Sequence, residues 1–247
     1  MKRIILFQLF TFFAFVSWGQ QYDSTYGKPL IILVEADPWA MVIGSDVPSF
    51  ALYENGQIIY HKIEGKRLKT YEVTLTKSEL QKVITSLGIS DSIYQLPIYI
   101  EASGWTDQPS TTLMLNLDST KVIVVYGRLE QNEESRLKTP KSFLTVYDNI
   151  KKYNSDSAKE WLPNKIEVLF WDYSYAPNKR PWIKGLPDLN SSTTVKRRNG
   201  MYSVYIDKRD FAGFKKYYST MGEKQAVEIN GKKMAISYRL PFPNLNR

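Results

Sequence analysis

Residues 50–87 read FALYENGQIIYHKIEGKRLKTYEVTLTKSELQKVITSL and carry the clearest fold signals in the chain. Glu54-Asn55-Gly56 separates two apolar runs, and Asn-Gly in such a position is a strong hairpin signal. Tyr71, Val73 and Leu75 then alternate with polar residues, which is the pattern of a half-buried strand. The first part of this stretch therefore predicts a hairpin followed by a further strand.

The second part of the stretch predicts an amphipathic helix. Thr76 and Glu79 have the spacing of a capping box, in which each side chain binds a backbone N–H that the helix leaves free. The apolar residues that follow recur at helical spacing and end near a glycine; they are Leu80, Val83, Ile84 and Leu87.

Short strands and helices continue on both sides of this stretch. Residues 30–34 form an apolar run of strand length, residues 112–126 predict a second hairpin, and Pro140 opens a helix. A strand, a helix and a hairpin turning on Asn230-Gly231 end the chain. Other segments are expected to be irregular, namely residues 98–109, 128–138 and 178–190.

We predict an α+β fold with mainly antiparallel sheets and helices packed on one face. The reason is that the strands pair through local hairpins, with helices inserted between them. The order strand–loop–strand–helix–hairpin occurs twice, which indicates an N-terminal lobe over residues 20–163 and a basic C-terminal lobe over residues 164–247. Two interpretations stay open: a structural duplication, or an ordinary α+β chain whose elements follow the same order.

The N-terminus predicts a secretory signal peptide over residues 1–19. Lys2-Arg3 forms a positive n-region, and residues 4–16 form an almost unbroken apolar run that is shorter than a membrane span. Small residues suit cleavage between Gly19 and Gln20. We therefore expect a soluble periplasmic or secreted bacterial protein, and a retained N-terminal anchor is the alternative.

Cysteine usage and charge narrow the possibilities further. The chain has no cysteine, which excludes disulfides, thiol nucleophiles, cysteine metal ligands and a lipid-modified cysteine. The formal net charge is +8 at pH 7, with 16 Lys and Arg against 7 Asp and Glu in residues 164–247 and 15 against 18 in residues 20–163. Either the two halves face each other or the basic half meets an anionic partner.

The sequence lacks the residues that most catalytic mechanisms require. His61 is the only histidine, so a Ser-His-Asp triad would depend on it, and there is no Gly-x-Ser-x-Gly elbow. Phosphate-binding glycine motifs and Asp-rich calcium loops are also missing. We predict no catalytic residue, metal site or cofactor. A carboxylate-based hydrolase is the alternative, with the candidate residues Glu35, Asp37, Glu101 and Asp107.

Tryptophans in irregular segments are the first candidate binding residues. Trp39, Trp105 and Trp182 each follow a proline or a glycine. A tryptophan ring offers a large rigid contact area and an N–H donor, which suits the recognition of proteins or sugars. The alternative is that each ring folds back and covers the edge of its own sheet.

A basic run is the second candidate binding surface. Lys196, Arg197 and Arg198 precede a predicted strand, and more basic and tyrosine residues lie around the last predicted helix. This mixture suits an anionic polymer or lipid headgroups, although a solvated face is the alternative. We do not expect nucleic acid as a partner, since an exported protein rarely meets it.

Residues 48–153 resemble emfourin-like and related small secreted bacterial domains. The resemblance implies an α+β domain and, because emfourins inhibit metalloproteases, an inhibitor as one function to consider. No inhibitory loop matches residue by residue, and the second half and the insert around Trp105 depart from the pattern. The segments that carry the resemblance are Phe50 to Gly56 with its strand partner, Leu80 to Leu87, Ile93 to Pro97, the 112–126 hairpin and the helix from Pro140.

Together these features predict an exported, non-catalytic binding or interaction protein. Its expected partner is a protein, an envelope glycan or another anionic polymer outside the cytoplasm. An emfourin-like protease inhibitor and a hydrolase of envelope polysaccharide are the alternatives.

Overall fold

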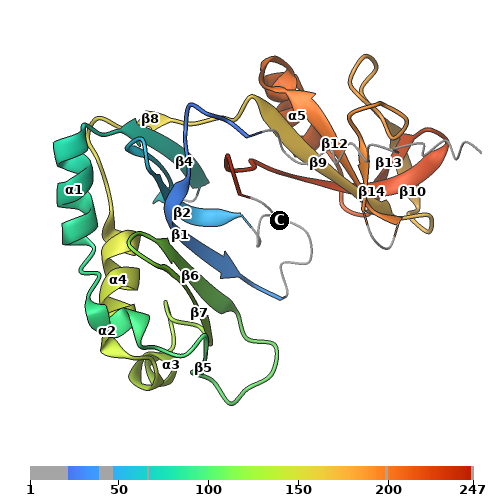
Figure 1. The fold of residues 1–247 in the computed structure, drawn as a ribbon. Coiled ribbons are helices and arrows are strands. Elements are labelled where there is room, and N and C mark those ends of the chain that lie inside the picture. Colours follow the sequence, from blue (N-terminus) through green and yellow to red (C-terminus); the bar gives the residue numbers. More distant parts are fainter. Residues whose placement is uncertain (1–21, 39–46, 66, 198–199, 246–247) are drawn as a thin grey trace, which may run out of the picture.

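The computed structural model describes residues 22–38, 47–65, 67–197 and 200–245. The predicted signal peptide, Trp39 and Arg198 lie outside these residues. Figure 1 shows two lobes, each built on one sheet, with helices on the outer face of the first sheet. The α+β fold predicted from the sequence is confirmed by these two sheets and their helices.

The first sheet has eight strands in the order β5-β7-β6-β1-β2-β3-β4-β8. All neighbours are antiparallel except β5 and β7, which are parallel. The strands are β1 (Pro29–Ala36), β2 (Pro48–Tyr53), β3 (Gln57–Glu64), β4 (Arg67–Thr74), β5 (Tyr99–Glu101), β6 (Ser110–Asn116), β7 (Thr120–Tyr126) and β8 (Lys159–Glu160).

Helices cover one face of this sheet and close its main core. Leu33 and Phe50 on the sheet and Phe143 and Val146 on α4 are among the residues of this core, all with 1 % or less of their surface exposed. The capping box is present, because the Thr76 N–H donates to Glu79 and the Glu79 N–H donates to Thr76. The helices are α1 (Lys77–Ser86), α2 (Asp91–Tyr94), α3 (Glu133–Lys138) and α4 (Lys141–Lys152).

The second sheet has six strands in the order β10-β13-β14-β9-β12-β11. Helix α5 (Phe211–Ser219), which follows the 3₁₀ turn η2 (Lys208–Asp210), packs on it through Phe214 and Tyr217. Only β10 and β13 are parallel among its pairs. The strands are β9 (Lys165–Asp172), β10 (Asn178–Pro181), β11 (Val195–Lys196), β12 (Tyr202–Asp207), β13 (Gln225–Ile229) and β14 (Lys232–Arg239).

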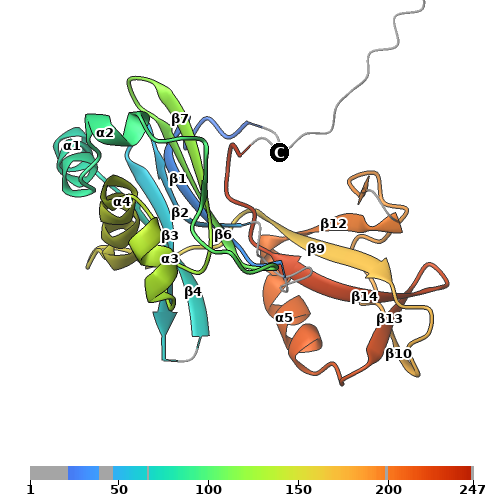
Figure 2. The same cartoon turned by 90° about the horizontal axis from the view of Figure 1, so that it is seen from below.

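The chain that follows β14 returns to the first sheet and ties the two lobes together. Figure 2 shows this C-terminal stretch running back from the second sheet toward the first. Phe242 packs on Trp161 with ring centroids 5.3 Å apart, and both belong to a buried cluster on the sheet face away from the helices. The Tyr53 hydroxyl donates to the Pro243 carbonyl at 2.9 Å. The C-terminal residues therefore serve as the cover of that face.

The structure corrects the three segments that were expected to be irregular. Residues 98–109 contain β5, residues 178–190 contain β10, and residues 128–138 contain α3. Both missed strands are short and pair in parallel with a strand distant in sequence, so no local alternation or turn marks them. Helix α3 is capped by Asn132, whose side chain accepts the Ser135 N–H at 2.9 Å.

The two sheets share a plan but differ in strand order. The first strand of each, β1 or β9, lies inside its sheet with a partner on both sides. β1 pairs with the first strand of its hairpin, β6, whereas β9 pairs with the second strand of its hairpin, β14. A strict repeat would place corresponding hairpin strands beside β1 and β9, and the two sheets differ at this point. The strand order therefore does not establish a structural duplication, which stays a prediction.

Candidate functional site

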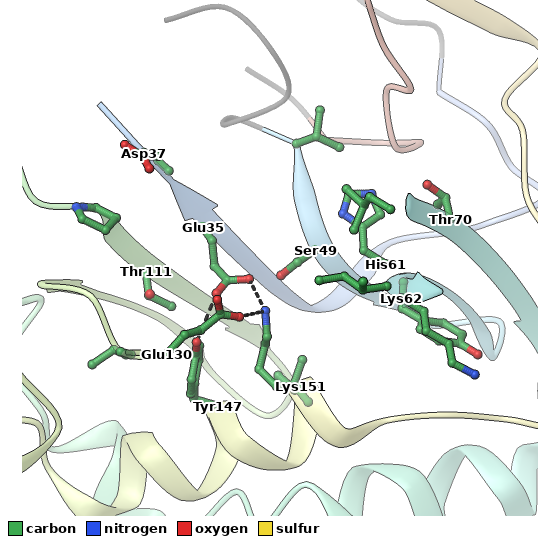
Figure 3. A pocket seen from close by; sticks show the side chains of 18 of the residues that line it. Glu35, Asp37, Ser49, His61, Lys62, Thr70, Thr111, Glu130, Tyr147 and Lys151 are labelled. Carbon is green, nitrogen blue, oxygen red and sulfur yellow. Dashed lines mark hydrogen bonds and ion pairs between the residues drawn. The ribbon is translucent and has the colours of Figure 1, made fainter. Parts of the chain in front are cut away.

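A cleft of about 980 Å³ opens where β1 ends and β2 begins. Residues at the end of β1, along β3 and on α4 line it, and the second lobe contributes Tyr218, Tyr238 and Arg239. Figure 3 shows its polar side chains, which reach toward one another from β1 and α4. The cleft thus lies where the two lobes meet.

The cleft exists because β2 is shorter than the strands on either side of it. β2 begins at Pro48, which pairs with Val34, and the chain bends at Val47. β1 continues to Ala36, paired with β6, and β3 continues from His61 to Glu64, paired with β4. A proline at this place has no backbone N–H to extend the ladder.

We call the space between these two strand ends the strand slot, with Glu35–Ala36 on one side and His61–Glu64 on the other. Among the residues that the structure describes, neither segment has a strand partner on the side that faces the slot. Neighbouring strands lie about 4.8 Å apart, so the strands on either side of a missing one lie about 10 Å apart. The strand slot is therefore wide enough for one extended chain.

A charged cluster forms the wall on the helix side of the slot. Lys151 Nζ lies 2.8 Å from Glu35 Oε2 and 2.6 Å from Glu130 Oε1, and the Tyr147 hydroxyl donates to Glu35 Oε1 at 3.1 Å. Burial alone lowers the pKa of Lys151, but the hydrogen bonds to Glu130 and Glu35 outweigh it and hold that pKa above its usual value. Burial, with the charge of Glu35, raises the pKa of Tyr147. Tyr147 is 2 % exposed, so its hydroxyl holds Glu35 from a fixed position, whereas the Glu130 side chain is 52 % exposed.

The wall on the opposite side of the sheet is mainly apolar. His61, Ile63 and Leu68 lie on this side, because His61 packs edge-on against Phe242 at 5.6 Å and side chains alternate along a strand. Burial and the nearby Lys151 charge lower the pKa of His61 to about 4, so the ring is neutral at pH 7. Ile63 and Leu68 are 72 % and 63 % exposed and remain free for contact.

The predicted carboxylates are only partly brought together. Glu35 and Asp37 line the cleft, and Asp37 lies 3.9 Å from Arg128, whereas Glu101 and Asp107 are not among the lining residues. Glu101 is the last residue of β5, and Asp107 lies in the loop that follows it. The four residues predicted for a hydrolase therefore do not form one site.

The predicted tryptophans have different environments. Trp105 is 71 % exposed on the loop after β5 and does not line the cleft. Trp182 packs edge-on against Phe170 with centroids 5.1 Å apart, and its indole N–H donates to the Pro187 carbonyl at 2.9 Å. Its ring and its donor are thus engaged within the second lobe, which is the fold-back arrangement considered above.

The predicted basic run is also divided. Lys196 is exposed on the edge strand β11, but Arg197 reaches inward, 2.6 Å from the buried Glu167. Arg239 lies 2.6 Å from the other Glu167 oxygen, and the Ser203 hydroxyl donates to Glu167 at 2.6 Å. Burial raises the pKa of Glu167, but the bonds to Arg239 and Ser203 outweigh it and hold that pKa below its usual value. Arg197 is thus a structural partner rather than an open anion site.

Apart from Glu35 and Asp37, the residues that define the cleft were not identified from the sequence. Lys151, Tyr147 and Glu130 come from α4 and the segment before α3, and they meet Glu35 only through the fold. Ile63 and Leu68 gave a usable signal, since two apolar residues near one charged hairpin tip can form an exposed apolar patch, and such patches mark interaction sites.

Within the described residues, no group of three or more His, Cys, Asp and Glu side chains could hold a metal ion. In the same part of the chain, no helix has both the length and the apolar character needed to cross a membrane. Comparison with protein-family models, curated proteins and solved structures found no match to this chain.

Proposed function

We propose that this protein binds an extended segment of a partner protein, which adds a strand in the strand slot between β1 and β3. The observation that carries the proposal is the start of β2 at Pro48, which leaves two facing strand edges without a partner among the described residues. Open strand edges recruit extended chains through main-chain hydrogen bonds. Here a segment could pair on both of its sides at once.

The two walls of the cleft indicate the pattern of the bound segment. Successive side chains of a strand point to opposite faces of the sheet. One set would meet Glu35 and Lys151 on the helix side, and the other would meet Ile63 and Leu68 on the opposite side. We therefore infer a segment in which polar or charged residues alternate with apolar ones.

Binding fits this cleft better than catalysis. The Glu35 and Glu130 carboxylates are both held by Lys151, and the neutral His61 ring packs on Phe242. The Ser49 hydroxyl, the serine at the start of β2, donates to the Leu33 carbonyl at 3.4 Å. None of these contacts prepares a nucleophile or pairs an acid with a base.

We further propose that this binding takes place outside the cytoplasm. The support is the N-terminal pattern of Lys2-Arg3, the apolar run over residues 4–16 and the cleavage point after Gly19. A partner segment that is exported itself follows from this location.

The direct test is selection of peptides from a library of random nine-residue sequences, with the protein purified from expression of the full chain. Enriched sequences should alternate apolar and polar residues. A selected peptide should bind Ile63→Ser about tenfold more weakly, because an exposed apolar wall is lost. Ile98→Ser is the matched control, since Ile98 is 70 % exposed and does not line the cleft.

A second control isolates the backbone contribution. The same peptide with alternate backbone nitrogens methylated keeps its side chains but cannot donate to the strand edges. It should lose most of its affinity. Equal binding by the methylated peptide, or equal losses in Ile63→Ser and Ile98→Ser, would refute strand addition in this slot.

A further inference from the structure

A second groove, of about 640 Å³, runs beside α5 in the C-terminal lobe. Its walls come from the loop after β10 and from η2 and α5, and it shares no lining residue with the cleft described above. Four cationic side chains line it against a single carboxylate, that of Asp210; they are Arg180, Lys184, Arg209 and Lys216.

The positive charge of this groove is not neutralised by its surroundings. Asp210 lies 3.8 Å from Arg209, so the one acid of the groove already has a partner. Within the part of the chain that the structure describes, Lys184 and Lys216 form no ion pair. Two ammonium groups are therefore available to an anionic ligand.

Arg180 is held in a fixed orientation at the same groove. Its guanidinium donates to the Tyr217 carbonyl at 3.1 Å and to the Thr220 hydroxyl at 2.9 Å, and it lies 3.9 Å over the Tyr217 ring. Since these partners are uncharged, its positive charge remains uncompensated. A guanidinium fixed in this way loses little side-chain entropy when an anion binds.

Glycines keep the groove open. Gly213 lies inside α5, where glycine weakens a helix relative to alanine. A Cβ atom at Gly213 would meet nothing within 4 Å, so packing does not require glycine there. Gly185 on the facing loop also has open space around it, and its φ of +91° favours glycine. The backbone at both positions is thus accessible to a ligand that lies along the groove.

We infer that this groove binds a linear anionic polysaccharide whose acidic groups contact Arg180, Lys184 and Lys216. A chain of sugar rings fits a concave groove with open backbone, whereas a membrane surface would need a protruding basic face with apolar anchors. Single-stranded nucleic acid would need exposed aromatic rings for stacking. Here Phe214 is fully buried and Tyr217 is covered by Arg180.

The test measures binding of polygalacturonate, with neutral dextran as the uncharged comparison. Lys184→Gln/Lys216→Gln should weaken polygalacturonate binding about five- to tenfold, and the remaining affinity should depend less on salt. Lys215→Gln is the matched control, because Lys215 is exposed on the same helix but does not line the groove. Its affinity should stay within about twofold of the native protein.

Gly213→Ala provides a readout that loss of folding cannot imitate. It should raise the melting temperature by about 2 °C, because alanine favours the helix, and still weaken polygalacturonate binding. Equal binding of dextran, an equal loss in Lys215→Gln, or unchanged binding in the double variant would overturn the inference. Tighter binding of phosphatidylglycerol vesicles or of single-stranded DNA through the same lysines would overturn it in favour of those ligands.

Discussion

Ile63 lies directly opposite Leu68 in the antiparallel pairing of β3 and β4, and both side chains are largely exposed on the wall of the cleft. This apolar pair stands on the part of the hairpin that extends beyond the start of β2. Cross-strand apolar pairs normally stabilise a sheet by packing under a neighbouring element. In the part of the chain that the structure describes, no element packs over this pair, and this exposed position is the basis of the proposed binding mode.

The single histidine should give the folded protein a distinct pH dependence. The pKa of His61 is lowered to about 4 from its usual 6.5, so its contribution to stability is complete above pH 6.5. As the pH falls, the unfolded chain takes up a proton that the folded protein does not bind. The free energy of unfolding should drop by about 1.5 kcal/mol between pH 6.5 and 5.

Chemical denaturation across this pH range measures the effect. His61→Gln should flatten the profile, since no other histidine titrates there. An unchanged slope in His61→Gln would show that the burial of His61 is not the cause.

The buried Glu167 should be essential for the stability of the second lobe. Glu167→Ala removes the carboxylate that Arg239, itself only 9 % exposed, and the Ser203 hydroxyl both contact, and should cost about 3–5 kcal/mol in the free energy of unfolding. Asp207→Ala removes the exposed pair with Lys165 and should cost less than about 1 kcal/mol. Urea denaturation compares the two, and similar losses would contradict the assigned role of Glu167.

The C-terminal stretch should stabilise the first lobe although it follows the second in sequence. Phe242 is 2 % exposed against Trp161 and His61, so Phe242→Ala should cost about 3–5 kcal/mol. Tyr175→Ala, at a residue 81 % exposed, should have little effect. Hydrogen exchange should show the loss of protection in β2 and β3, and a loss confined to the second sheet would contradict this arrangement.

Substitution of Trp182 and of Trp105 should have different effects on stability, because the two rings have different environments. Trp182→Ala removes a ring packed on Phe170 and Phe214 and should cost about 3 kcal/mol or more. Trp105→Ala, at an exposed ring, should change stability by less than about 0.5 kcal/mol. Thermal unfolding of both variants measures the two stability changes. If Trp182→Ala left stability unchanged, Trp182 would again be a candidate binding residue.

Local signals predicted most of the fold correctly. The hairpin at Asn55-Gly56, the capped helix from Thr76 and the final hairpin at Asn230-Gly231 depend on residues close in sequence, and the structure contains them all. The α+β class followed from their order. The parallel strands β5 and β10 could not be predicted in this way, because their partners lie far along the chain.

The candidate site was much less predictable than the fold. Its slot results from the difference in length between β2 and its neighbours, and strand ends are poorly marked in a sequence. Glu35 was singled out as a carboxylate, but its partner Lys151 lies 116 positions away. Arg197 was predicted as a binding residue because it belongs to a basic run. In the fold its guanidinium contacts the buried Glu167 instead.

Hydrogen–deuterium exchange with a selected alternating peptide tests the central claim most directly. If the peptide adds a strand in the slot, the fragments that contain Glu35–Ala36 and His61–Glu64 should both gain protection, because edges that no described strand pairs with there acquire hydrogen-bond partners. The fragment with Trp105 should not change. Protection at the Trp105 loop, or none at the two strand edges, would contradict the proposed mode of binding.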